Sequence, residues 1–265
     1  MSASEAWLAK RAALYSNEVD LPVLRQMLGE LNATLCPAGL ADTEQIVAMN
    51  AGLNLGTLAK LFVDACLRAH LYGFEVQRKL YAGNAAAFRP YPNAHIFNLG
   101  LSDREETLNI SMPGNAHGGA GLWQPAGRWR RSRRVGSART VTLRVFAREH
   151  HLRRVDYFAL DVEGFEPRVI DGMDLCDGAR VFSAFQWEAG GTWLDERHPA
   201  GARDREAQLS QLAACGYVSH LIGLSRPCDG KQLFTSSRHH SMGRCGHGSY
   251  FPQVTAMRDG GRSSS

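Results

Sequence analysis

Two carboxylates follow a short apolar run in the segment DYFALDVEGFE, residues 156–166. Asp161 ends the run, and Glu163 follows just before Gly164. A buried strand that ends in acidic residues and a glycine presents them at the carboxyl edge of an open α/β sheet, where ligands bind. A carboxylate at such an edge can take a proton from a substrate, so Asp161 and Glu163 are the candidate catalytic residues. Glu163 has an alternative role as a cap for the helix that follows.

A second group of candidate residues lies about a hundred residues earlier, in the turn NAGLNLG, residues 50–56. Glycines let the backbone turn sharply and let a ligand lie against it, and the helix that follows offers free N–H groups. Many purely structural turns have the same composition. Glu75 ends the next apolar segment, roughly where the ribose-binding acid of a dinucleotide-type fold falls. The alternative for Glu75 is a surface glutamate at a strand end.

A polar pair, Ser102 and Asp103, follows a third apolar segment in NLGLSD. Such a pair can cap a helix, turn the chain or hydrogen-bond a ligand, and the sequence favours none of these over the others.

The elements that position these residues alternate between strand and helix patterns. The expected strands are 45–49, 70–75, 94–99, 155–161, 180–188, 217–222 and an edge strand at 249–254. Helical spacing covers 58–66, 78–88, 142–151 and 203–214. This rhythm predicts an α/β fold with a mostly parallel twisted sheet of about seven strands and helices on both faces.

The domain organisation predicted from these patterns has one main unit with additions. Residues 1–40 have helical spacing and form an N-terminal helical extension, and 41–255 form the main domain. The glycine-rich and arginine-rich stretch 111–140 interrupts the rhythm as a loop or hairpin insertion, and 256–265 form a disordered tail.

Taken together, the motifs NAGLNLG, FE, NLGLSD, LDVEGFE and QWE resemble the FkbM family of S-adenosylmethionine-dependent methyltransferases. The resemblance extends over roughly residues 45–217, and LDVEGFE is its most specific element. It implies a Rossmann-like class I methyltransferase fold, S-adenosyl-L-methionine as cofactor, and O-methylation of a hydroxyl on a small molecule or sugar.

The same resemblance implies roles for single residues. Gly52, Asn54 and Gly56 would line the methionine moiety and Glu75 the ribose. Ser102 and Asp103 would lie near the adenine, and Asp161 at the mouth of the pocket near the methyl group.

Three positions depart from the family pattern. Asn50 stands where the family has an aspartate, Ala159 where it has a lysine, and Arg144 where it has an aspartate. Asn50 keeps the capacity to hydrogen-bond the cofactor but carries no charge. The departures favour an alternative function, a catalytically silent fold relative that works by interaction.

A second alternative rests on an arginine cluster that lies near two tryptophans, Trp123 and Trp129. Basic and aromatic residues together are typical of nucleic-acid binding, although a solvated loop has the same composition. The chain has no NPPY-like tetrad, which argues against base methylation. The arginines of the cluster are Arg128, Arg130, Arg131, Arg133, Arg134 and Arg139.

Six scattered cysteines without a C-x-x-C pair favour reduced thiols over a disulfide framework or a zinc site. The spacing of His239, His240, Cys245 and His247 matches no zinc pattern, so no metal is expected. No apolar run is long enough to span a bilayer and no signal-peptide core is present, which predicts a cytoplasmic protein without membrane contact. The sequence names neither the acceptor nor the oligomeric state.

Overall fold

The computed structural model describes residues 46–66, 68–112, 122, 133–176, 182, 184–188, 205–222, 234–236 and 253–258. The predicted N-terminal extension, Arg128 to Arg131, and the histidine-rich stretch around His239 lie outside these residues. Within the described part, no helix is long and apolar enough to cross a membrane.

The main sheet has eight strands in the order β10-β9-β11-β8-β7-β1-β2-β3. The five strands from β8 to β3 are parallel, whereas β11 is antiparallel to both β8 and β9. The strands are β1 (Ile46–Ala51), β2 (Ala69–Phe74), β3 (Ala94–Phe97), β7 (Tyr157–Leu160), β8 (Ala184–Glu188), β9 (Tyr217–Ile222), β10 (Phe234–Ser236) and β11 (Gln253–Arg258).

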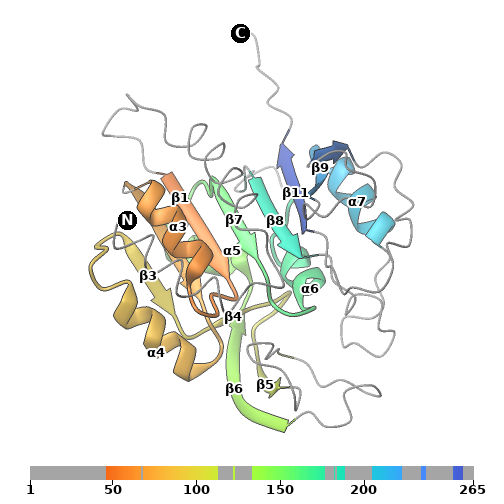
Figure 1. Cartoon of the computed structure of the whole chain (residues 1–265). Coiled ribbons are helices and arrows are strands. Elements are labelled where there is room, and N and C mark those ends of the chain that lie inside the picture. The colour runs from red at the N-terminus through yellow and green to blue at the C-terminus, as the bar shows by residue number, and fades with distance from the viewer. Residues whose placement is uncertain are drawn as a thin grey trace, which may run out of the picture.

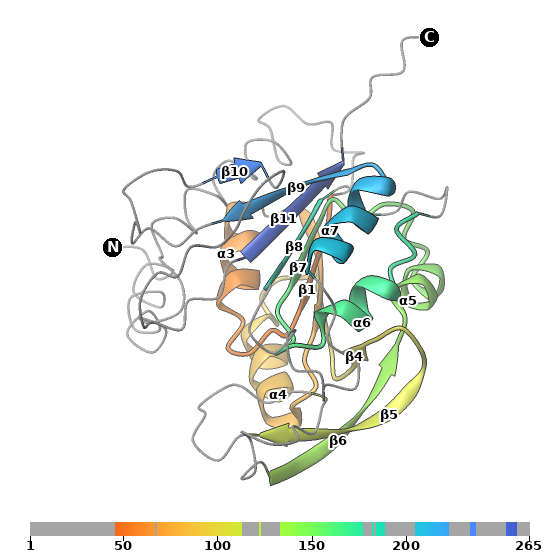
Figure 2. The ribbon, with the colours of Figure 1, turned by 90° about the vertical axis from the view of Figure 1, so that its right-hand side faces the viewer.

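Helices cover both faces of this sheet, as Figure 2 shows with the sheet seen nearly edge-on. One face carries α3 and α4 with one apolar cluster, and the other carries α5, α6 and α7 with a second cluster. All six residues of β1 are buried, as expected for a central strand covered on both sides. The helices are α3 (Thr57–Ala65), α4 (Arg78–Ala87), α5 (Leu143–Glu149), α6 (Glu166–Asp171) and α7 (Arg205–Ala214).

This arrangement is the predicted Rossmann-like α/β fold, and the predicted parallel sheet is confirmed. The chain places β2 and β3 on one side of β1, and β7 and β8 on the other. The strand order therefore reverses between β1 and β7, which run side by side in the same direction (Figure 1). Ligands of open α/β sheets bind outside the carboxyl ends of the strands at such a reversal.

The interruption predicted at 111–140 is a hairpin with a small sheet of its own, in the order β4-β6-β5. Its strands are β4 (Gly100–Leu101), β5 (Glu106–Met112) and β6 (Arg133–Val141). The hairpin thus begins earlier than predicted, and three arginines of the cluster, Arg133, Arg134 and Arg139, are paired with β5. Figures 1 and 2 show it extending away from the main sheet.

The last strand differs from its prediction in its residue range and in its neighbours within the sheet. β11 runs to Arg258 and lies between β8 and β9, so it is an internal strand, and the predicted tail from 256 begins too early. The residues of a short strand do not show whether it lies at the edge of a sheet or between two other strands, because its neighbours depend on how the rest of the sheet assembles.

The prediction of reduced cysteines is wrong for the described residues. Cys176, after α6, and Cys215, after α7, form a disulfide with their Cα atoms 4.7 Å apart. Cys66 is also disulfide-bonded. Cys176 and Cys215 lie 39 residues apart in the chain, so the spacing of the cysteines in the sequence does not predict the pair.

Candidate functional site

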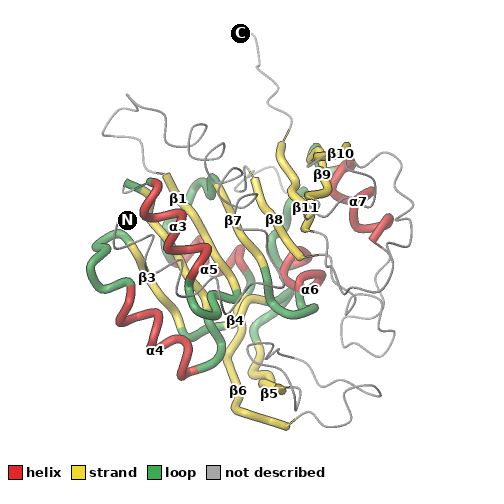
Figure 3. Tube along the Cα trace, in the orientation of Figure 1, coloured by secondary structure: helices red, strands yellow, loops and turns green. Residues whose placement is uncertain are grey.

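A pocket opens at the carboxyl edge of the sheet, where the strand order reverses. The space between its walls, counted together with the open mouth, is about 560 Å³. Figure 3 shows that the loops after β1 and β7 lie at this edge. The lining residues are Ala51, Gly52, Asn54, Phe74, Glu75, Val76, Gln77, Leu99, Gly100, Leu101, Leu122, Asp161, Val162 and Glu163.

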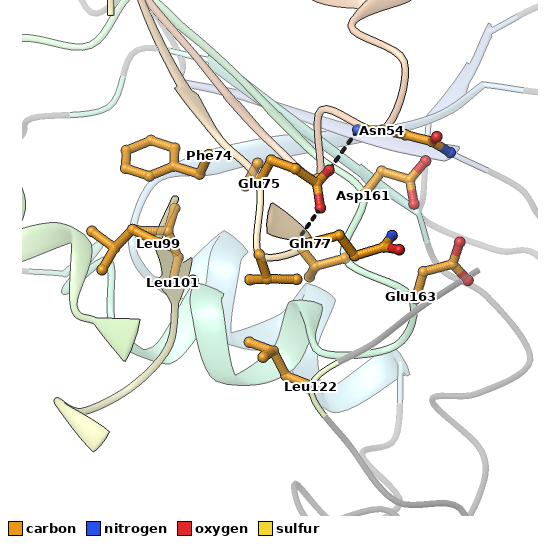
Figure 4. Close-up of a pocket in the computed structure, with 14 residues that line it drawn as sticks. Asn54, Phe74, Glu75, Gln77, Leu99, Leu101, Leu122, Asp161 and Glu163 are labelled. Atoms are coloured by element: carbon orange, nitrogen blue, oxygen red, sulfur yellow. Dashed lines mark hydrogen bonds between the residues drawn. The ribbon is translucent and has the colours of Figure 1, made fainter. Parts of the chain in front are cut away.

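The pocket has an apolar end and an acidic end, with Glu75 and Gln77 between them (Figure 4). Aliphatic and aromatic side chains form the apolar end, and Asn54, Asp161 and Glu163 lie at the other. Four predicted site residues from two distant segments, together with Glu75, therefore meet in one place. They are Gly52, Asn54, Asp161 and Glu163.

Glu75 follows β2 and is only 4% exposed. One carboxylate oxygen accepts a hydrogen bond from the Asn54 amide and the other from the Gln77 amide, each at 2.8 Å. Burial raises the pKa of Glu75 above its ordinary value, and hydrogen bonds from the amides of Gln77, Asn54 and Val76 offset part of that effect. Each oxygen has a second lone pair, so Glu75 can still accept from a ligand hydroxyl.

The glycine turn owes its shape to contacts within the chain. Gly52 has a φ of 76°, and a Cβ there would overlap the carbonyl oxygen of Asp161. Gly52 is therefore required because the loop after β1 passes against the end of β7. Asn84 of α4 supports the turn from the other side, since its amide donates to the Asn54 carbonyl at 2.8 Å.

Two lining residues that are not glycine have left-handed backbone conformations, Asn54 with φ 49° and Glu163 with φ 58°. Such conformations cost free energy and gather at functional sites. The turn after β7 is closed by Glu166, whose carboxylate accepts from the Val162 amide at 2.8 Å. The amide of Val162 is thus bound by Glu166, and Glu163 itself lines the pocket.

Asn50 lies in β1 and is 4% exposed, but it is not among the lining residues. Its side-chain amide donates to the carbonyl of Ala159, its partner across the β1–β7 pair, at 3.2 Å. Asn50 and Ala159, two of the three positions that depart from the FkbM pattern, are therefore in contact with each other. The third, Arg144, forms an ion pair with Asp174 on the surface at 2.5 Å.

Ser102 and Asp103 are also absent from the pocket lining. The Ser102 hydroxyl donates to Asp103, and Arg168 of α6 donates to the same carboxylate at 2.6 Å. Partial burial alone would raise the pKa of Asp103, but Arg168, Ser102 and Arg104 outweigh it and hold the pKa below its ordinary value. The structure thus gives Asp103 an ion-pair role, and its contact with an adenine stays a prediction.

Sequence reasoning missed the apolar end of the pocket. Val76 and Gln77 directly follow Glu75, so their place could have been inferred from it. Leu122 has no such signal, because it lies between the two hairpin strands and far along the chain from the other lining residues.

The described residues contain no group of three or more His, Cys, Asp or Glu side chains that could hold a metal ion.

Comparison with known proteins gives similarities only among solved structures. The chain matches no family model and no curated protein. A precorrin-6y C5,15-methyltransferase from Geobacter metallireducens is 9% identical with a TM-score of 0.44, covering 88% of each chain. A SAM-dependent methyltransferase from Aquifex aeolicus is 10% identical with a TM-score of 0.42, covering 91% of this chain and 94% of that one. The human methyltransferase 10 domain containing protein is 7% identical with a TM-score of 0.47, covering 97% and 98%.

Proposed function

We propose that this protein is a methyltransferase that uses S-adenosyl-L-methionine. The observation that carries the proposal is the order of groups along one pocket: an apolar end, then a buried carboxylate, then an acidic end. A nucleoside with a cationic tail has the same order of an apolar base, ribose hydroxyls and positive charge. The resemblance of the motifs to the FkbM family supports the same cofactor.

The residues present fit that group. Glu75 is buried, held by two backbone amides, and keeps lone pairs for the two ribose hydroxyls. Gly52 lies in the wall, where the loop after β1 passes against the Asp161 carbonyl at the end of β7. When bound, S-adenosylmethionine supplies an already activated methyl group, so the protein must mainly align an acceptor and receive its proton.

We assign to Asp161 the role of accepting the proton that the methyl acceptor loses. Asp161 follows β7, lies at the acidic end and faces the same pocket as Glu75 (Figure 4). A carboxylate there can accept the proton of an acceptor hydroxyl as its oxygen attacks the methyl carbon. We therefore propose O-methylation of a small molecule or sugar, with Glu163 beside Asp161 as a second carboxylate of the site.

Two other functions make different predictions. A silent relative would bind the cofactor weakly or not at all, and the Asn50–Ala159 contact is the observation in its favour. A nucleic-acid enzyme would use Arg133 and Arg134, which are exposed at the start of β6. Binding to RNA or DNA that falls steeply with salt would support that second function.

Calorimetry with S-adenosylhomocysteine and S-adenosylmethionine tests the proposal. We expect micromolar affinity for both, about 8 kcal/mol, and a rise in melting temperature with ligand concentration. S-Adenosylhomocysteine that neither binds nor stabilises the protein at millimolar concentration would refute the cofactor assignment.

We also propose the cytoplasmic location that the sequence predicts, and the Cys176–Cys215 disulfide is the observation against it, because such bonds persist mainly in oxidising compartments. Alkylation of free thiols in intact cells, followed by mass spectrometry, decides the matter. Alkylated Cys176 and Cys215 would support the cytoplasm.

A further inference from the structure

We infer that Leu122, supplied by the connection between the hairpin strands β5 and β6, forms a wall of the slot that receives the nucleoside base. The inference rests on the proposed function, because it assigns a part of the same pocket to a part of the same ligand. It makes the hairpin a component of the cofactor site rather than a separate insertion.

Leu122 is buried although the hairpin extends from the main sheet. It is 6% exposed and belongs to the same apolar cluster as Phe74 and Leu101. Val135 of β6 is 39% exposed and is the large apolar residue of the described part that faces solvent. The hairpin therefore gives one aliphatic side chain to the pocket and leaves another outside it.

Gly100 makes the approach of Leu122 possible. A Cβ on Gly100 would lie 2.9 Å from the Leu122 Cδ1 methyl, 2.9 Å from the Thr140 methyl and 3.2 Å from a Val76 methyl. Three residues from different parts of the chain converge on this point: Val76 after β2, Thr140 of β6, and Leu122. The absence of a side chain at Gly100 leaves the space that the methyl groups of Leu122 and Val76 approach.

The side chains here are aliphatic and aromatic: Figure 4 shows Phe74, Leu99 and Leu101 together on one side of Glu75, and Leu122 below Glu75 and Gln77. A flat heteroaromatic base fits such a slot by contact area and by exclusion of water. The polar candidate for the base, Asp103, is engaged by Arg168 and does not line the pocket. The base is therefore held by aliphatic contacts, of which Leu122 supplies one wall.

The test compares Leu122→Ala with Val135→Ala, which removes the same kind of side chain from the same hairpin outside the pocket. The dissociation constants of S-adenosylhomocysteine and of 5′-methylthioadenosine are measured for both variants. We expect Leu122→Ala to weaken both ligands by a similar factor of about ten or more, since both carry the base, and Val135→Ala to weaken neither.

Leu122→Met keeps the volume and should retain affinity within about threefold, which separates loss of the wall from a folding defect. If wild type binds S-adenosylhomocysteine and Leu122→Ala binds it as tightly as Val135→Ala does, the inference is wrong and Leu122 only packs the hairpin. If wild type itself does not bind, the proposed function fails, and this inference fails with it.

Discussion

Replacing Glu75 by glutamine tests the centre of the pocket with the smallest change in shape. In the wild type, each carboxylate oxygen accepts one backbone amide. The glutamine NH2 group must face either the Asn54 or the Gln77 amide, so one donor meets another donor. A buried group left without its hydrogen bond costs about 1–3 kcal/mol of stability. Removal of the buried charge stabilises the fold and offsets part of that loss, because burial disfavours the ionised form of Glu75.

The effect on ligand binding should be larger than the effect on folding. A hydrogen bond to a charged group contributes about 1.5–3 kcal/mol, so the loss of the charged acceptor should weaken S-adenosylhomocysteine by roughly ten- to a hundredfold. Calorimetry of both proteins measures this directly. A 2′-deoxyribose analogue is the control, since it lacks one hydroxyl and should lose less affinity on going from wild type to variant.

The pH dependence gives an independent measurement. The pKa of Glu75 is raised in the folded protein, so its ionisation destabilises the fold, and this penalty grows as pH rises from 4.5 through the folded pKa. Ligand binding needs the carboxylate, so affinity should fall as pH drops through the same folded pKa. Glu75→Gln should show neither trend. If wild type and variant bind S-adenosylhomocysteine equally tightly across this pH range, Glu75 does not bind the ribose.

Two further predictions concern the ends of the site. Asp161→Asn should lower the rate of methyl transfer by about 10²-fold or more and change cofactor affinity little. Glu163→Gln is the matched control, with a much smaller loss of rate. Full turnover of Asp161→Asn on the true acceptor would refute the role of Asp161 as base. Arg168→Met should cost about 1–3 kcal/mol in urea unfolding, because Arg168 is buried between Asp103 and Glu106. The pKa of Asp103 is held below its ordinary 3.8, so its ion pair stabilises the fold above that pH and is lost on acidification, a dependence that the variant should lack. A drop in cofactor affinity in Arg168→Met would instead indicate that Asp103 contacts the adenine of the cofactor.

The parts of the site that the sequence predicts are those fixed by strand ends. Glu75 and Asp161 follow apolar strands, and parallel strands present their carboxyl ends at one edge, so their meeting with Gly52 needs no further information. Sequence alone could not show that Gly52 is required by the Asp161 carbonyl rather than by a ligand, because that contact joins residues 109 positions apart.

Elements that depend on distant partners were harder to predict. β5 and β6 stabilise each other and enclose a long connection, so neither strand carries the bounding turn that marks a tight hairpin. Leu122 is one leucine among many in the sequence, and only its packing on Gly100 gives it a place in the pocket. The Cys176–Cys215 bond likewise joins two residues that are 39 positions apart in the sequence.

Asn50 shows how a family resemblance and a structure can lead to opposite expectations. If Asn50 is a weakened version of an acid that faces the cofactor, Asn50→Asp should tighten S-adenosylmethionine more than S-adenosylhomocysteine, because the sulfonium charge distinguishes them. In the structure the Asn50 side chain instead donates to the Ala159 carbonyl inside the sheet, at 3.2 Å.

An aspartate at position 50 would place a buried carboxylate against that carbonyl and leave the carbonyl without its donor. We expect Asn50→Asp to lose about 2–4 kcal/mol at neutral pH. The loss should shrink on acidification, because burial raises the pKa of the new carboxyl and its protonated form can donate to Ala159. Urea unfolding at several pH values measures this, and Asn50→Ser is the uncharged control. A variant as stable as wild type that binds S-adenosylmethionine selectively would show that position 50 acts on the cofactor after all.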